Sequence, residues 1–185
     1  MLTFGYLAHY KGTDWLIKSF KNYLLKFPNK KLHLTVAGGP NPNHLTKPSY
    51  QKYLNQVNTL AKHPQITLTS FVKEKDISKI FSKTNLVIFP YRTAMSSSGP
   101  LSIALSFHKP FIISQPLQKY TQTRDLNVTP NNLTFPLSQK GFDAALNNLL
   151  KSKNLTKLTQ LSKNLAQKRS WVKIAKQYLP HLTSS

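Results

Sequence analysis

The sequence of 185 residues contains no cysteine and only five acidic residues. Without cysteine the chain forms neither disulfide bonds nor thiolate metal sites, and nothing in its composition indicates an oxidising compartment. Its apolar runs are far shorter than the roughly 18 to 20 residues of a transmembrane helix, and its N-terminus lacks the build of a signal peptide. These absences predict a soluble, cytoplasmic protein with enough residues for one hydrophobic core.

The scarcity of acidic residues makes the chain strongly basic, because 26 lysine and arginine residues stand against five acids. The resulting formal net charge of +21 favours anionic partners such as nucleic acid, lipid headgroups or phosphorylated substrates. The basic residues are spread along the chain without an aromatic-basic nucleic-acid motif. We therefore expect an anionic substrate or the inner membrane surface, and not nucleic acid. A solvated lysine-rich surface without a partner is the alternative interpretation.

Motifs for metal and nucleophilic chemistry are also missing. The five acids include no Asp-x-Asp pair, and the six histidines do not have the spacing of a zinc site. There is no Ser-His-Asp or Cys-His arrangement and no Walker-type loop. We expect no metal and no cofactor, and the residues alone identify no catalytic group.

The central stretch of the sequence runs from Leu86 to Ser114. An apolar run, Leu86–Phe89, leads through Ser96–Gly99 into a helical pattern and a second apolar run at Phe111–Ile113. This is typical of a parallel β-α-β unit, whose first turn lies at the carboxyl edge of the sheet, where open α/β sheets bind ligands. A serine-rich turn at a helix N-terminus predicts an anion site, most naturally for phosphate. An ordinary N-capped helix is the alternative.

The rest of the chain continues this alternation without a domain boundary. Further strands are predicted at Leu2–Leu7, Leu32–Ala37, Ile66–Phe71 and Leu133–Phe135. Further helices are predicted from Thr13 or Asp14 to Leu25, at Tyr50–Lys62, Asp76–Ser82 and Gln139–Lys151, and from Leu155 through Gln167 towards Leu179, with a loop after Ser114. We therefore predict one α/β domain over residues 1–185, a Rossmann-like, doubly wound parallel sheet of about six strands with helices on both faces and a C-terminal helical extension.

A series of short motifs gives the chain a recognisable order. They are Phe4-Gly5, Tyr10-Lys11-Gly12-Thr13-Asp14-Trp15-Leu16, Leu34-Thr35-Val36-Ala37-Gly38, Phe89-Pro90-Tyr91, Ser98-Gly99-Pro100-Leu101-Ser102-Ile103-Ala104-Leu105, Lys109-Pro110 and Ser170-Trp171-Val172-Lys173-Ile174-Ala175. In this order the chain resembles, over essentially its whole length, the C-terminal nucleotide-sugar-binding domain of retaining GT-B glycosyltransferases of the group 1 type. Those enzymes transfer sugars from UDP-, GDP- or ADP-sugars.

The resemblance implies a donor site at the carboxyl edge of the sheet. Its residues would be Gly5, Lys11, Gly12, Gly38, Gly39, Phe71, Val72, Arg92, Ser97, Ser98 and Gly99.

Each implied residue has a role in the family pattern. Lys11 matches a lysine that contacts the donor diphosphate, a role that suits its mobile charge, and Arg92 would add a second charge. Ser97–Gly99 match the turn where the diphosphate meets backbone amides. The glycines match close backbone approaches to the donor, and Phe71-Val72 matches the loop that holds the base. Tight turns, core packing or a solvated surface position are the alternative roles.

The sequence departs from the family pattern at three positions. Tyr6 stands where members usually carry an arginine, and Met95 and Ile103 stand in place of two glutamates. The second of those glutamates binds the ribose hydroxyls in the family, and Ile103 has no hydrogen-bond acceptor to replace it. We expect weak donor binding, or a nucleotide held mainly through its base and diphosphate.

A GT-B enzyme also has an N-terminal Rossmann-like domain, which supplies the acceptor site and most catalytic side chains. This chain begins almost at the first strand of the C-terminal domain, so we expect residues 1–185 to be the C-terminal domain without the N-terminal acceptor domain. The resemblance implies the donor-binding half of a retaining, metal-independent glycosyltransferase with a lipid, glycan or polysaccharide acceptor. The chain would then be either a fragment of a longer enzyme or one half of a split enzyme whose N-terminal-domain subunit is its partner. The alternative is a non-catalytic module that binds a nucleotide, an anionic surface or a protein through a degraded site.

Overall fold

The computed structural model of the chain describes residues 1–122 and 133–182, which form a six-stranded parallel sheet with two helical layers. The strands are β1 (Leu2–Phe4), β2 (Leu34–Ala37), β3 (Ile66–Leu68), β4 (Val87–Phe89), β5 (Phe111–Ser114) and β6 (Thr134–Phe135). Their order is β3-β2-β1-β4-β5-β6, with every pair parallel. This is the strand order of a doubly wound Rossmann-like sheet, and it confirms the predicted fold class.

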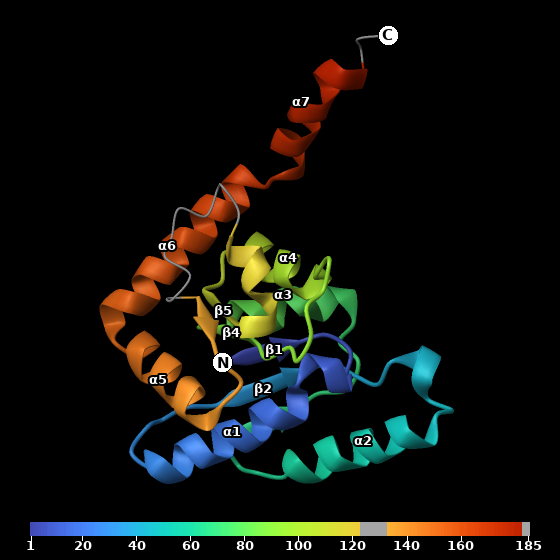
Figure 1. Cartoon of the computed structure of the whole chain (residues 1–185), viewed down its shortest axis with the longest axis vertical. Helices are drawn as coiled ribbons and strands as arrows, with labels where there is room; N and C mark the ends of the chain where they lie inside the picture. The colour runs from blue at the N-terminus through green and yellow to red at the C-terminus, as the bar shows by residue number, and fades with distance from the viewer. Residues whose placement is uncertain (123–132, 183–185) are drawn as a thin grey trace.

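The helices cover both faces of the sheet. They are α1 (Thr13–Lys26), α2 (Pro48–Leu60), α3 (Glu74–Ser82), α4 (Gly99–Ser106), α5 (Gln139–Leu149), α6 (Ser152–Lys168) and α7 (Trp171–Leu182), with short 3-10 helices η1 (His9–Lys11), η2 (Pro42–His44) and η3 (Gln115–Thr121). In Figure 1, α1, α2 and α5 lie on one side of the sheet, and α3 and α4 lie on the other. Helix α6 packs against α4 and α5, and α7 extends away from the domain.

The core lies between the sheet and these two layers. Because both faces are covered, the central strands are continuous apolar runs, and Val87, Ile88 and Phe89 of β4 are fully buried. On the α1 side, the Trp15 ring stacks on Phe135 of β6 with ring centroids 6.0 Å apart. The apolar runs that predicted the central strands therefore lie in the hydrophobic core.

The structure corrects the sequence prediction at the C-terminal helices. The helix predicted from Leu155 towards Leu179 is interrupted, since α6 ends at Lys168 and α7 begins at Trp171. Between them the Ser170 hydroxyl accepts a hydrogen bond from the Lys173 N–H at 3.4 Å. A serine that caps a helix in this way favours a new helix start over continuation. Similarly, the predicted loop after Ser114 begins as the 3-10 helix η3.

Across residues 1–122 and 133–182, no helix has both the length and the apolar character needed to cross a membrane.

Two ion pairs connect distant elements: Arg92 with Asp14 and Lys26 with Asp143. Both acids of these pairs sit on helices of the α1 side, so the few carboxylates described there are used to join elements.

Candidate functional site

A cavity of about 310 Å³ opens at the carboxyl edge of the sheet. It extends over the ends of β1, β2 and β3 and reaches the start of α4, and so includes the crevice between β1 and β4 where the strand order reverses. Open α/β sheets bind ligands at this switch point. The lining residues are Phe4, Gly5, Tyr6, Lys11, Ala37, Gly38, Gly39, Phe71, Val72, Ile77, Gly99, Pro100 and Ile103.

The cavity unites most of the residues that the sequence predicts for the site. Those in its lining are Gly5, Lys11, Gly38, Gly39, Phe71, Val72 and Gly99. They come from four different turns, which the parallel strands bring to one edge. The predicted residues outside the lining are Gly12, Arg92, Ser97 and Ser98.

Lys11 provides the positive charge of the cavity. A Cβ built on Gly5 would lie 2.8 Å from Lys11 Nζ and 3.1 Å from the Pro100 ring, so the ammonium group lies over Gly5 beside the start of α4. Burial lowers the pKa of Lys11, because its charged form is desolvated. In the described part of the chain, the two ion pairs involve other lysine and arginine residues. Within residues 1–122 and 133–182 no carboxylate pairs with Lys11, and a half-buried ammonium of this kind is suited to bind an anion.

The N-terminus of α4 offers fewer amides than the sequence predicts. The Ser98 hydroxyl caps the helix and accepts a hydrogen bond from the Leu101 N–H at 3.3 Å. Pro100 has no N–H, so within the first turn the amide of Gly99 is left to point at a ligand. The space at this position is open, since nothing lies within 4 Å of a Cβ built on Gly99. At the Ser-Gly turn, therefore, the Gly99 amide and the nearby Lys11 ammonium are the groups that could meet an anion.

Arg92 does not face the cavity. Its guanidinium donates to the two Asp14 carboxylate oxygens at 2.8 and 2.7 Å and to the His9 carbonyl at 2.6 Å. Its backbone N–H donates to the Tyr10 carbonyl at 2.7 Å. Burial raises the pKa of Asp14, but the hydrogen bonds and charge of Arg92 outweigh burial and hold that pKa below its usual value. Arg92 thus holds η1, the segment that ends in Lys11, against the start of α1.

Two glycines permit the tight packing around this segment. Gly12 has φ +68°, and a side chain there would overlap the Pro90 carbonyl. Gly38 lies so close to Gly5 that a side chain would overlap the Gly5 carbonyl oxygen. Residues without a side chain are required where backbones approach this closely. Gly12 therefore has a structural role beside the site, and Gly38 allows the close approach to the Gly5 backbone in the lining of the cavity.

A stacked aromatic pair forms the far rim of the cavity. The rings of Tyr6 and Phe71 have centroids 6.0 Å apart and an interplanar angle of 28°. Tyr6 is 40% exposed and Phe71 is 62% exposed. Sequence reasoning named both residues singly and missed their contact, because they follow different strands. The apolar lining residues Phe4 and Ile77 were missed as well, since nothing distinguishes them locally from core residues.

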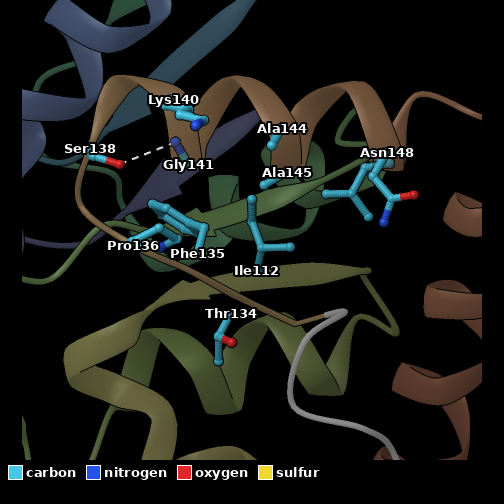
Figure 2. Close-up of a pocket in the computed structure, with 11 residues that line it drawn as sticks. Ile112, Thr134, Phe135, Pro136, Ser138, Lys140, Gly141, Ala144, Ala145 and Asn148 are labelled. Atoms are coloured by element: carbon cyan, nitrogen blue, oxygen red, sulfur yellow. Dashed lines mark hydrogen bonds between the residues drawn. The ribbon is translucent and has the colours of Figure 1, made fainter.

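Two larger cavities lie elsewhere and lack this combination of features. A cavity of about 550 Å³ lies between β6 and α5, where the Ser138 hydroxyl caps α5 at the Gly141 N–H (Figure 2). Lys140 is the one ionisable residue among its lining residues. Another cavity of about 650 Å³ lies at the amino edge of the sheet beside Met1. The carboxyl-edge cavity is the better candidate, because it alone of the three lies at the switch point.

Metal ligands do not gather anywhere in the described residues. Within residues 1–122 and 133–182, no three histidine or acidic side chains come close enough together to hold a metal ion. The groups that the cavity itself offers are an ammonium and a helix N-terminus, next to an aromatic and apolar surface.

Comparison with known proteins gives this arrangement a family. The family model described as glycosyl transferases group 1 matches residues 1–152. Mannosylfructose-phosphate synthase from Agrobacterium fabrum is 25% identical in an alignment 146 residues long, which covers 70% of this chain and 31% of that protein. This chain thus corresponds to less than half of that relative.

Solved structures show the same fold. The C-terminal domain of a glycosyl transferase group 1 family protein (LpcC) from Francisella tularensis matches with a TM-score of 0.67 and 20% identity, over 91% of this chain and 84% of that one. HepE from Anabaena, in complex with UDP, matches with a TM-score of 0.75 and 17% identity, over 100% of this chain and 48% of that one. Since the family model covers most of the sequence and the fold agrees throughout, the chain belongs to the group 1 glycosyl transferases.

Proposed function

We propose that this chain is the donor-binding half of a retaining glycosyltransferase that moves a sugar from a UDP-, GDP- or ADP-sugar to a lipid, glycan or polysaccharide acceptor. The observation that carries the proposal is the Lys11 ammonium, placed over Gly5 beside the open start of α4. This is where a diphosphate would meet both a cation and a helix N-terminus. The structures of HepE with UDP and with UDP-glucose support a uridine nucleotide as the first donor to test.

Sugar transfer breaks the bond between the anomeric carbon of the sugar and the β-phosphate oxygen, and the electron pair stays on the diphosphate. Negative charge therefore grows on the β-phosphate as the bond breaks. Lys11 and the Gly99 amide would stabilise that charge more strongly in the transition state than in the bound donor. Burial lowers the pKa of Lys11, and an anionic diphosphate beside it would raise that pKa and so favour the charged form. In this proposal the phosphate charge is neutralised without a metal ion.

The acceptor and the remaining catalytic groups would come from a second Rossmann-like domain. The relatives support this division, since the aligned regions make up 31% of mannosylfructose-phosphate synthase and 48% of HepE. The second domain would belong to the same polypeptide or to a separate subunit. The net charge of +21 favours a position at the anionic inner surface of the membrane, in the cytoplasm.

Titration calorimetry with UDP, GDP, ADP and their sugar conjugates tests donor binding. We expect at least one of them to bind, and Lys11→Ala to raise its Kd about tenfold or more, because a hydrogen bond to a charged group is lost. Lys18→Ala is the matched control: it removes the same charge from an exposed position on α1, so it should leave the Kd unchanged.

The same titration decides between the proposal and its alternative. If no nucleotide or conjugate binds at millimolar concentration, the donor-binding function is wrong. Binding to anionic lipid vesicles in that case would favour the non-catalytic module. Two features are consistent with this alternative: the described lining of the cavity contains no carboxylate, and Arg92 is paired with Asp14 outside that lining.

A further inference from the structure

The carboxyl-edge cavity has two chemically different ends. At one end, Lys11 Nζ lies over Gly5 and beside the Pro100 ring. At the other end, the rings of Tyr6 and Phe71 stack 6.0 Å apart. Phe71 follows β3, which lies two strand spacings, about 10 Å, from β1. A nucleotide with its phosphates at the first end and its base at the second would have its pentose between them.

The wall between these ends is apolar. Ile103 lies one helical turn after Pro100 on α4, and Ile77 on α3 and Val72 complete that wall. Among the described lining residues, the side chains with polar atoms are Lys11 and Tyr6, and neither is a carboxylate or a carboxamide. The pentose hydroxyls of a bound nucleotide would therefore meet the carbon atoms of this wall, whose side chains provide no acceptor for them.

This wall changes the energetics of sugar recognition. Binding is weakened when a ligand hydroxyl leaves water without finding a hydrogen-bond partner in the site. A hydrogen bond from that hydroxyl to a carboxylate would instead strengthen binding about tenfold or more. With an isoleucine wall the 2′-hydroxyl gains no hydrogen bond from the side chains of that wall. Affinity then comes from the diphosphate on Lys11 and from stacking of the base on an aromatic ring, and neither depends on the 2′ position.

We infer, on the basis of the proposed function, that this site takes 2′-deoxyribonucleoside diphosphates and their sugar conjugates at least as readily as the ribonucleotides. The substrate class of the transferase thus extends to deoxynucleotide sugars. The residue that sets this specificity is Ile103, because it places apolar surface on the wall where a pentose would lie.

Calorimetry on the full chain with matched nucleotide pairs tests the inference. The pairs are UDP with 2′-deoxy-UDP, GDP with 2′-deoxy-GDP, and ADP with 2′-deoxy-ADP. For the base that binds, we expect the Kd of the deoxy form to be no more than threefold above that of the ribo form. A ribonucleotide preference larger than threefold overturns the inference but leaves donor binding intact. If no pair binds, the proposed function fails and the inference fails with it.

Ile103→Glu provides a second test by adding a carboxylate to the wall. We expect this variant to prefer the ribo form about tenfold, because its carboxylate accepts hydrogen bonds from the pentose hydroxyls. Ser102→Glu adds the same charge at an exposed neighbouring position outside the lining and should leave the ratio of the two Kd values unchanged. A folded Ile103→Glu variant with an unchanged ratio overturns the placement of the pentose. The comparison in the unmodified chain holds even if the variant does not fold.

Discussion

The ion pair between Arg92 and Asp14 offers a direct test of how the site is built. Its two guanidinium–carboxylate hydrogen bonds measure 2.8 and 2.7 Å, and the side chains are 25% and 7% exposed. Exposed pairs contribute about 0 to 1 kcal/mol, whereas removing one partner of a buried pair costs about 3 to 5 kcal/mol. Since a quarter of the arginine still meets solvent, we expect a coupling free energy of about 2 kcal/mol.

A double-mutant cycle measures that coupling. The variants are Asp14→Asn, Arg92→Gln and the double variant, and the free energy of unfolding comes from urea titration at pH 7. The pair of Lys26 and Asp143 is the control, because the lysine side chain is 61% exposed and a coupling below about 1 kcal/mol is expected. A coupling below about 0.5 kcal/mol for the Arg92 pair would refute the reasoning.

The pH dependence of the same variants gives an independent check. The pKa of Asp14 is raised by burial but lowered more by Arg92, and its net value lies below the usual one. A folded-state pKa below the unfolded value of about 3.9 stabilises the protein above that pH, and the stabilisation is lost as the pH falls through the folded pKa. The difference in unfolding free energy between the unmodified chain and Asp14→Asn should stay constant from about pH 7 to 5 and shrink below about pH 4. A decline between pH 7 and 5 would contradict this assignment.

Two further predictions concern the floor and rim of the cavity. Gly38→Ala should lower the free energy of unfolding by about 2 to 4 kcal/mol, because its Cβ would overlap the Gly5 carbonyl. Gly99→Ala is the control: it has open space at its Cβ and should change the free energy of unfolding by less than about 1 kcal/mol. Equal losses for the two variants in urea titrations would contradict the packing. Phe71→Ala removes a ring that is 62% exposed, so stability should hold within about 0.5 kcal/mol while the Kd of a bound nucleotide rises about five- to tenfold or more. An unchanged Kd in calorimetry would exclude base stacking on this ring.

The sequence predicts those features that depend on local patterns. The apolar run Leu86–Phe89 predicts a buried strand because strands covered on both faces have no polar side to show. The Ser-Gly turn predicts a helix start, and Ser98 is the cap. Residues 98–101 also limit the number of free amides at this turn, because Pro100 has no N–H and the Ser98 hydroxyl accepts from the Leu101 N–H. The proline could be read from the sequence, but the use of the Leu101 amide by the serine cap was not considered when the anion site was predicted.

Features that depend on tertiary placement could not be predicted in the same way. Arg92 follows β4 and Asp14 lies in the first turn of α1, 78 residues away in sequence. Only the neighbouring positions of β1 and β4 in the sheet bring the two side chains together. The sequence offered Arg92 as a phosphate ligand because an arginine after a strand suits that role equally well. The structure pairs it with Asp14, outside the lining of the cavity, and local patterns do not reveal a partner so far along the chain.

The two departures Tyr6 and Ile103 are best understood together. At these positions the resemblance implies an arginine and a glutamate, so the substitutions remove one positive and one negative charge. Lys11 remains as the charged side chain in the described lining, so in the proposed donor site the attraction for a diphosphate would persist. The recognition of the nucleoside would change instead, from charged hydrogen bonds to an aromatic ring and an apolar wall. Because both side chains lie at the surface of the cavity and not in the core, this change leaves the fold of the family intact.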